Sequence, residues 1–321
     1  MSAQAAKKVL TIGEILVEIV ATTRGTGFLA AQPLIGPFPS GAPAIFIDQV
    51  GRLGTAAAIL AQVGDDDFGR LNTERLARDG VDISGIAISP DLPTGTAFVR
   101  YRDSGARDFV FNIAHSAAGQ LPSTAATDKL IDDAGHLHIM GTALSAPGMA
   151  DMTRNALRRI KGKGGTVSFD PNLRPEILEA PGLRAALEET LAATDLFLPS
   201  GEELTLFTQA RDEAGAVAEL QERGIAHIVL KRGAAGASHF GPDGRCDSAP
   251  IAVEEIDPTG AGDCFGGAFV ALWLAGEDPQ TTLRYANAAG AFAVTRLGPM
   301  EGVASRADLD ALLAQHQRSS S

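Results

Sequence analysis

The chain has 321 residues, of which 45% are hydrophobic and 21% charged, with 36 Gly and 17 Pro. This composition excludes disordered, collagen-like and coiled-coil proteins and predicts one or two globular domains with a sizeable core. The formal charge of -12 offers no basic surface for a phosphate backbone or an anionic membrane, so we expect neither nucleic acid nor membrane as a partner. Two cysteines and the lack of any long apolar run favour a reduced, cytoplasmic protein.

The first part of the chain mixes strand and helix patterns around a long loop. The sequence predicts one strand over residues 9–20 and then a loop over 21–43, rich in Pro and Gly, with at most short strands. A helix over 44–54, a short strand over 57–63 and a second helix over 67–79 follow. We therefore expect strand and helix to alternate from the start of the chain.

Residues 95–113 break this pattern, because polar and apolar side chains alternate on both sides of an Asp-Ser-Gly turn. Such alternation predicts a β-hairpin, with Phe98 and Arg100 on its polar and aromatic face. Since strand–helix repeats surround it, we expect the hairpin to belong to a small sheet that stands off the main domain.

Regular alternation returns after residue 136. The predicted strands cover 136–140, 166–170, 196–199 and 228–231, with helical stretches such as 184–193 between them. This order favours a mostly parallel, doubly wound α/β sheet. An antiparallel pair over 237–240 and 248–253, helices over about 264–275 and 279–296, and a frayed tail complete the prediction.

The sharpest motif is Asp-Pro-Thr-Gly-Ala-Gly-Asp at residues 257–263, which runs directly into an apolar helix. Small residues at a helix start let several backbone N–H groups converge on an anion, so the motif predicts a phosphate cradle. Asp263 has two interpretations at this stage. It either accepts a hydroxyl proton or caps the helix.

Other candidates are weaker. Residues 25–30 match a dinucleotide-binding glycine pattern, but the prolines that follow exclude the helix which that pattern needs. His136 and His138 share one face of a strand and could bind a metal, although a structural role is more common for a lone pair. The runs 170–174 and 231–233 end strands, at the edge where doubly wound sheets bind ligands.

Together these features resemble the ribokinase-like, or pfkB, family of carbohydrate kinases from about residue 13 to residue 298. Besides residues 257–263, the stretches Gly41-Ala42-Pro43-Ala44, 51–54 and 63–69 match family signatures. The resemblance implies an α/β/α sandwich with a small β lid. We expect one kinase domain over 8–318, a lid formed by about 14–40 and 95–115, and tails at 1–7 and 319–321.

The resemblance also implies roles for individual residues. Asp263 would be the general base, and Gly260, Ala261 and Gly262 the anion hole around the transferred phosphoryl group. ATP, with Mg²⁺ and an optional K⁺, is the implied cosubstrate. The ATP-binding residues would be Ser200, Lys231, Gly233, Gly236 and Asn287, together with Gly260 and Gly262. Glu203 would organise Mg²⁺ through water, and Asp257 and Thr259 would serve the K⁺ site.

The implied acceptor site departs from the usual family pattern. Glu18 stands in place of the usual Asp, Ser40-Gly41 in place of Gly-Gly, and Ile45 in place of Asn. The predicted substrate-binding residues are Glu18, Gly41, Ala42, Phe98, Arg100, Asn112, Arg174 and Asp263. We expect in-line transfer from ATP to a neutral ketohexose of the tagatose or fructose type, in a homodimer formed through the lid.

Three rival functions stay open. A 2-keto-3-deoxygluconate kinase would need cations such as Arg100 and Arg174 for the substrate carboxylate. A nucleoside kinase would need an aromatic pocket for the base. A non-catalytic sugar-binding regulator would have no use for a proton acceptor at the phosphate site.

Overall fold

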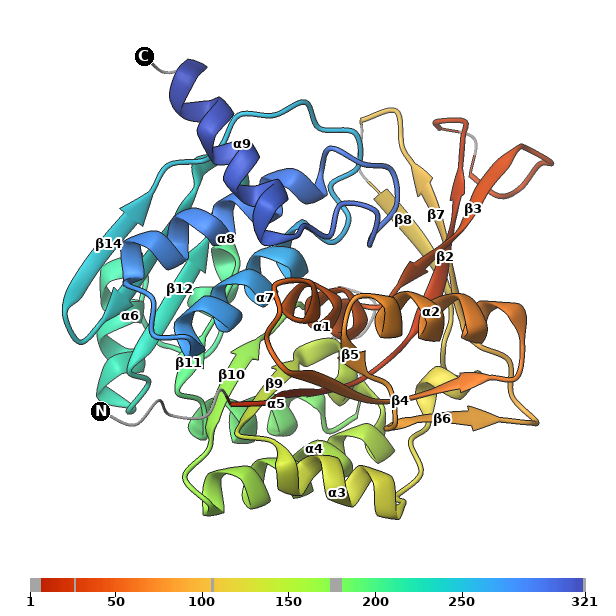
Figure 1. The fold of residues 1–321 in the computed structure, drawn as a ribbon, viewed down its shortest axis with the longest axis horizontal. Helices are drawn as coiled ribbons and strands as arrows, with labels where there is room; N and C mark the ends of the chain where they lie inside the picture. Colours follow the sequence, from red (N-terminus) through yellow and green to blue (C-terminus); the bar gives the residue numbers. More distant parts are fainter. Residues whose placement is uncertain (1–6, 26, 105–106, 174–180, 320–321) are drawn as a thin grey trace.

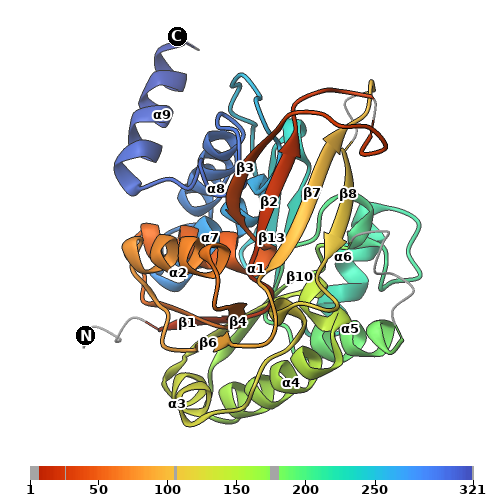
Figure 2. The same ribbon diagram turned by 90° about the vertical axis from the view of Figure 1, so that its right-hand side faces the viewer.

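The computed structural model describes residues 7–25, 27–104, 107–173 and 181–319. Within these residues the chain forms a ten-stranded sheet with helices on both faces and a second, four-stranded sheet at one edge (Figure 1). This is the predicted α/β fold, a three-layer sandwich with a small β lid. Figure 2 shows the second sheet standing away from the layers of the main body.

The large sheet runs in the order β14-β13-β12-β11-β10-β9-β1-β4-β5, with β6 beside β4. All its pairs are parallel except those that join β12 to β13 and β13 to β14. The neighbouring strands β1 and β4 are almost entirely apolar and buried because helices cover both of their faces. The strands are β1 (Val9–Ile12), β4 (Ala57–Gly64), β5 (Val81–Asp82), β6 (Ile86–Ser89), β9 (His136–Met140), β10 (Thr166–Asp170), β11 (Leu196–Phe197), β12 (His227–Lys231), β13 (Ala237–Gly241) and β14 (Gly244–Ser248).

Two helical layers bury separate apolar clusters against this sheet. One layer holds α1 (Ala42–Arg52), α2 (Asp67–Arg78), α7 (Ala261–Leu274), α8 (Pro279–Ala293) and α9 (Arg306–Ser319). The other holds α3 (Ala125–Asp133), α4 (Pro147–Gly162), α5 (Leu183–Ala192) and α6 (Glu213–Glu222). None of the helices in the described part of the chain is long and apolar enough to span a membrane.

The four-stranded sheet, called the lid below, has the order β3-β2-β7-β8. Its strands are β2 (Leu16–Ala21), β3 (Leu34–Ser40), β7 (Gly95–Tyr101) and β8 (Arg107–Asn112). β7 and β8 form the antiparallel hairpin that the alternation predicts, and β7 pairs in parallel with β2. The lid therefore joins segments from the start of the chain to the hairpin.

The single strand predicted over residues 9–20 is wrong, because it is two strands in two different sheets. β1 belongs to the large sheet and β2 to the lid, and the chain crosses between them at Gly13. A Cβ atom at Gly13 would lie 2.3 Å from Cγ of Pro43, at the start of α1. The crossing therefore requires a residue without a side chain, which the strand propensity of its neighbours does not reveal.

Two further differences concern the ends of elements. The second strand of the antiparallel pair covers Gly244–Ser248 rather than the predicted 248–253, because Gly241 pairs with Gly244 across a two-residue turn. β3 is a full strand inside the stretch whose composition predicts mainly loop, and α9 is a helix that the pattern did not indicate. The remaining predicted strands and helices lie within a few residues of their observed positions.

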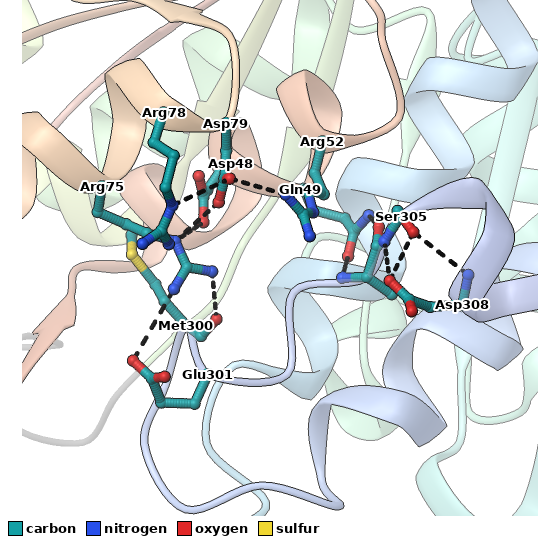
Figure 3. A network of polar contacts seen from close by, with 11 residues as sticks. Asp48, Gln49, Arg52, Arg75, Arg78, Asp79, Met300, Glu301, Ser305 and Asp308 are labelled. Carbon is teal, nitrogen blue, oxygen red and sulfur yellow. Dashed lines mark hydrogen bonds and ion pairs between the residues drawn. The ribbon is translucent and has the colours of Figure 1, made fainter.

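A buried ionic network joins α1, α2 and the turn after α8 (Figure 3). We call Arg75, Asp48 and Asp79 the Arg75 cluster. The Arg75 Nε atom lies 3.0 Å from Asp48 Oδ2 and 2.8 Å from Asp79 Oδ2, and its Nη2 donates to the Met300 carbonyl at 2.6 Å. The cluster thereby holds the turn around residue 300 against α1 and α2.

Candidate active site

A cavity of about 430 Å³ lies between the lid and the carboxyl ends of the central strands. This is the position at which parallel α/β sheets bind ligands. Its walls come from the lid, from the segments that follow β1, β8 and β9, and from the first turns of α1, α4 and α7. The lining residues are Glu14, Leu16, Glu18, Ser40, Gly41, Ala42, Ile45, Phe111, Ile113, Ala114, Ala118, Gly119, Thr142, Ala143, Ser145, Ala146, Met149, Thr259 and Asp263.

The phosphate cradle predicted at residues 260–262 forms the N-terminus of α7. Gly260 is the residue before the helix and has a left-handed backbone, with φ of 81°. A Cβ atom there would lie 2.4 Å from the Pro299 carbonyl oxygen. Glycine is thus required both by the left-handed backbone and by the close approach of the turn after α8. The backbone N–H groups of the first turn of α7 lie next to the cavity.

Asp263 lies in the first turn of α7 and lines the cavity, with only 7% of its surface exposed. The capping interpretation of Asp263 is wrong, because Gly260 occupies the cap position. The Asn172 side-chain amide donates a hydrogen bond of 3.1 Å to Asp263 Oδ1. This contact orients the carboxylate, and Asn172 itself holds a left-handed backbone with φ of 39°, which is costly for a residue other than glycine.

One buried cation lies between carboxylates beside this helix N-terminus. We call Lys231, Asp170 and Glu203 the Lys231 cluster. The Lys231 ammonium forms an ion pair with Asp170 Oδ2. Although burial opposes a charged lysine, Asp170 and Glu203 raise the pKa of Lys231, so it carries its positive charge. A Cβ atom at Gly262 would lie 3.9 Å from the Lys231 Nζ atom, which brings this charge to the phosphate cradle.

Glu203 fits a magnesium-organising role only in part. Its Oε1 accepts a 2.8 Å hydrogen bond from the Leu173 N–H, and its Oε2 accepts one of 2.7 Å from the Ser200 N–H. Burial, followed by the neighbouring Asp170, raises the pKa of Glu203. A divalent cation nearby would offset this crowding of negative charge.

Within the described ranges, no three His, Cys, Asp or Glu side chains come together as a direct metal-binding cluster. Magnesium usually keeps several waters and is held by one or two carboxylates together with substrate phosphates. The Lys231 cluster suits that arrangement, with Asp170 and Glu203 as the carboxylates. The residues present therefore fit a Mg²⁺ ion that arrives with a nucleotide.

The other predicted ATP-binding residues lie along the same edge of the large sheet. Gly233 and Gly236 flank a short 3-10 turn after β12, with φ of 52° and 84°. A Cβ atom at Gly236 would lie 2.3 Å from the Ser248 carbonyl oxygen. Asn287 of α8 donates two hydrogen bonds of 3.1 Å to the carbonyls of Ser248 and Ala249, so its amide group braces the segment after β14.

The predicted K⁺ residues form a tight turn just before the cradle. Asp257 Oδ1 accepts hydrogen bonds from the Thr259 N–H at 3.0 Å and from the Thr259 hydroxyl at 2.7 Å, and its Oδ2 accepts one of 3.0 Å from the Gly298 N–H. A cation here would find Oδ2 as the less occupied oxygen. The turn is held in place by the protein's own groups whether or not a cation binds.

On the acceptor side, the predicted residues Glu18, Gly41 and Ala42 all line the cavity. The Ser40 hydroxyl donates a 2.7 Å hydrogen bond to Glu18 Oε1, which fixes this buried carboxylate. Glu14 adds another carboxylate to the lining that the motifs did not single out. Sugar hydroxyl groups are natural donors to such oxygens.

Three predicted lid residues lie on the opposite face of the lid and do not line the cavity. Phe98 packs edge-on against Phe28, with ring centroids 6.1 Å apart, and Arg100 forms an ion pair of 2.8 Å with Asp108. Asn112 pairs with Thr96, on that same outer face.

Successive side chains of a strand point to opposite faces of the sheet, and the sequence does not show which face lines the cavity. The predicted residues Phe98, Arg100 and Asn112 belong to the face that points away from it. The set that faces the main body contains Ala97 and Val99 of β7, which pair with Phe111 and Phe109 of β8. Phe111, followed by Ile113, reaches the cavity. The predicted residue Arg174 lies outside the described residues.

The histidine pair has a structural environment. Both ring nitrogens of His136 have hydroxyl partners, Thr166 at 2.9 Å and Ser168 at 2.8 Å, and His138 Nδ1 lies 2.7 Å from the Ser168 hydroxyl. Burial lowers the pKa of His136 to about 3 and the pKa of His138 well below its ordinary value. These neutral rings bridge β9 and β10 inside the core.

The structure thus places Asp263, Glu18, Gly41 and Ala42 in the lining of one cavity, and Lys231 and Glu203 lie outside this lining, beside the phosphate cradle. The sequence analysis noted the run 170–174 at the ligand-binding edge but gave Asn172 no role of its own. The arrangement offers a proton acceptor beside a site for anionic phosphate. That chemistry suits transfer of a phosphoryl group to a hydroxyl in the cavity.

Comparison with known proteins agrees with this chemistry. The family model of the pfkB family carbohydrate kinases matches residues 6–306. The 2-dehydro-3-deoxygluconokinase of Thermoproteus tenax is 31% identical over 317 residues, which cover 97% of this chain and 95% of that protein. The fructokinase of Salmonella typhimurium is 31% identical over 324 residues, which cover 94% of this chain and 98% of that protein.

A solved structure is also similar over the whole fold. A protein from E. coli named ribokinase II, solved in complex with ATP and Mg²⁺, is 45% identical with a TM-score of 0.90. The match covers 97% of this chain and 100% of that chain.

Proposed function

The chain belongs to the pfkB family of carbohydrate kinases, and we propose that it transfers the γ-phosphoryl group of ATP to a hydroxyl of a neutral ketohexose. The observation that carries this proposal is the position of Asp263, which lines the acceptor cavity and also lies in the first turn of the helix behind the phosphate cradle. The Asp263 carboxylate thus lies beside both the acceptor cavity and the proposed phosphate cradle.

In the proposed mechanism Asp263 accepts the proton of the attacking hydroxyl. Asn172 orients the carboxylate through its 3.1 Å hydrogen bond to Oδ1. The N–H groups of Gly260, Ala261 and Gly262 and the ammonium of Lys231 stabilise the negative charge on the transferred group. The lid covers the acceptor and excludes water, which would otherwise compete as a phosphoryl acceptor.

ATP would lie along the edge formed by Ser200, Gly233, Gly236 and the end of α8. Asp170 and Glu203 would hold Mg²⁺ through water, and the ion would supply charge neutralisation between the phosphates. The E. coli protein solved with ATP and Mg²⁺ supports both ligands for a chain of this fold. Asp257 and Thr259 remain the predicted residues for an optional K⁺.

The cavity favours a neutral sugar over an acidic one. Its described lining includes the carboxylates Glu14, Glu18 and Asp263 but no Lys, Arg or His side chain. Among the described residues, an anionic acceptor would therefore meet repulsion and no matching cation, while Arg174 lies outside them. This supports a tagatose or fructose type of substrate ahead of 2-keto-3-deoxygluconate; the 2-dehydro-3-deoxygluconokinase and the Salmonella fructokinase are both 31% identical to the chain, so the choice rests on the cavity.

A nucleoside kinase and a non-catalytic regulator have less support. Phe111 is the only aromatic residue in the described lining, so a nucleoside base would find a single ring against which to stack. A non-catalytic regulator would not need the Asn172 and Asp263 pair at the phosphate site. Both remain outcomes of the assay below.

The deciding experiment is a coupled ADP-release assay with D-tagatose, D-fructose, 2-keto-3-deoxygluconate, D-ribose and adenosine as acceptors. The Asp263→Asn variant, purified in the same way, corrects for contaminating kinases. We expect kcat/KM for the best ketohexose to exceed that for 2-keto-3-deoxygluconate by about 100-fold, the cost of an unpaired charge in the cavity. Preference for 2-keto-3-deoxygluconate would overturn the choice of substrate, and no ADP release with any acceptor would overturn the enzyme activity proposed.

We further propose a single kinase domain over residues 8–318 with the four-stranded sheet as its lid, working as a cytoplasmic homodimer. The exposed lid residues Leu34, Ile35 and Val110 are between 42% and 51% accessible, and apolar residues of that kind favour contact between two lids. Light scattering of the purified protein tests the dimer, and a monomer at assay concentration would exclude it.

A further inference from the structure

The lid hairpin touches the active-site turn at its tip, where β7 ends and β8 begins. Tyr101 ends β7 and Arg107 begins β8, and the two residues are partners across the hairpin. The Tyr101 hydroxyl donates a 3.1 Å hydrogen bond to Asp257 Oδ1, and the Arg107 guanidinium donates to the Thr259 hydroxyl. The same β8 carries Phe111, which lines the cavity. One rigid hairpin therefore joins the acceptor site to the turn before the phosphate cradle.

These contacts form a continuous chain of donors that ends on a buried charge. Arg107 donates to the Thr259 hydroxyl, and that hydroxyl donates to Asp257 Oδ1. Asp257 is 1% exposed. Burial, followed by the charge of Asp257, raises the pKa of Tyr101, so its hydroxyl stays a donor.

Arg107 differs from the other arginines of the hairpin. Arg100 and Arg102 form ion pairs with Asp108 at 2.8 Å and 2.7 Å. Within the described residues Arg107 has no carboxylate within ion-pair distance, and it lies over the Phe109 ring at 5.8 Å. Its positive charge is therefore available to the turn rather than neutralised within the lid.

We propose that Tyr101 and Arg107 are positioning residues for phosphoryl transfer. They hold Asp257 and Thr259 so that the cradle at residues 260–262 takes its working geometry when the lid covers the acceptor. The inference rests on the proposed role of that cradle as the anion hole. It gives the lid a second task besides covering the sugar, because the hairpin that contacts the acceptor also orders the groups that stabilise the transferred charge.

The test compares Tyr101→Phe, Arg107→Met and Arg107→Lys with Arg102→Met as the matched control. Arg102 lies on the same hairpin, is 60% exposed along its side chain and contacts only Asp108 among these groups. With the ketohexose that the wild type uses best, we expect Arg107→Met and Tyr101→Phe to lower kcat by about 30-fold, with KM for ATP and sugar within about twofold, since misplacement of a catalytic group by about 1 Å has effects of this order. Arg107→Lys should regain part of the lost kcat, and Arg102→Met should match the wild type.

Hydrogen exchange of the free proteins gives a second readout that needs no substrate. We expect the amides of residue 257 and residues 259–262 to exchange at least about tenfold faster in Arg107→Met than in Arg102→Met, because the turn loses its contact with the lid. A kcat within twofold of the wild type in both Tyr101→Phe and Arg107→Met overturns the proposal, as does a loss confined to KM. If the wild type phosphorylates none of the acceptors, the proposed function fails, and the exchange comparison alone decides whether the lid orders the turn.

Discussion

In both the Arg75 cluster and the Lys231 cluster, one buried cation lies between carboxylates that come from different elements (Figure 3 shows the first). The surroundings differ. Arg75 donates hydrogen bonds to Asp48 and to the Met300 carbonyl and forms an ion pair with Asp79, while Arg52 adds a 3.0 Å contact to Asp79. The Arg75 cluster is thus balanced in charge by side chains of the protein.

The Lys231 cluster has more acids than bases and adjoins a cavity. Lys231 faces Asp170, Glu203 and, beyond them, Asp263, and burial with the charge of Asp170 raises the pKa of Glu203. A balanced cluster braces the fold, whereas one with unbalanced charge beside a cavity can gain from a bound ion or substrate. The difference between the clusters therefore separates a structural role from a catalytic one, and each prediction below tests that separation.

The largest effect is expected from Asp263→Asn, at the edge of the Lys231 cluster. The amide cannot accept the hydroxyl proton, so kcat should fall by about 1,000-fold. Because asparagine has nearly the same size and shape as aspartate, we expect ATP affinity within about threefold of the wild type. Initial-rate kinetics and calorimetric titration with ATP measure both. A variant with more than a tenth of the wild-type kcat would remove Asp263 from the mechanism.

Arg75→Met should have the next largest effect, and it should be on stability. The substitution leaves Asp48 and Asp79 buried without their shared cation, which costs about 3–5 kcal/mol in the free energy of unfolding. Urea unfolding measures this loss. The KM values of the fraction that remains folded should stay within about twofold of the wild type, and a rise in KM for ATP without loss of stability would contradict the structural role.

Lys231→Met should act mainly on the nucleotide. Loss of a charge-assisted contact to phosphate is worth about 1.5–3 kcal/mol, so kcat/KM for ATP should fall by about 100-fold. The double variant Lys231→Met with Asp170→Asn serves as the control, because it also removes the carboxylate that forms the ion pair with the lysine. It should unfold near the wild-type urea midpoint and keep the kinetic defect. Recovery of activity in the double variant would show that Lys231 acts only through stability.

The sequence pattern predicted the position of the Lys231 cluster, whereas it did not predict the Arg75 cluster. Lys231 and Asp170 end predicted parallel strands, and such strands bring their carboxyl ends to one edge, so the pattern located them. Asp48 and Arg75 lie on amphipathic helices whose charged positions look like ordinary solvent-facing residues. Only the packing of α1 against α2 turns them inward.

The lid shows the same limit. Alternation predicts the hairpin at residues 95–113, but it does not say which alternate set faces the cavity, so it pointed to Phe98 and Arg100 in place of Phe111. Contacts such as that between Tyr101 and Asp257 join residues far apart in the chain and carry no local signal. Local patterns therefore predict elements and strand-end chemistry, and tertiary packing decides which faces meet.

Asp48→Asn should give the smallest effect, a change in how stability depends on pH. Burial raises the pKa of Asp48 to about 7, with Arg75 opposing the shift and Asp79 adding to it. Because the pKa is higher in the folded state than in the unfolded chain, Asp48 contributes stability that is complete below its ordinary pKa and is lost as the pH rises through about 7.

The wild type should therefore lose about 2 kcal/mol relative to Asp48→Asn between pH 5.5 and pH 8, from the linkage of one proton. Urea unfolding at several pH values in this range measures the two curves. Parallel curves for wild type and Asp48→Asn would mean that Asp48 stays ionised beside Arg75. The residues of the Arg75 cluster would then keep the same charges throughout this range. Of the two clusters, only the Lys231 cluster would have more acidic than basic side chains.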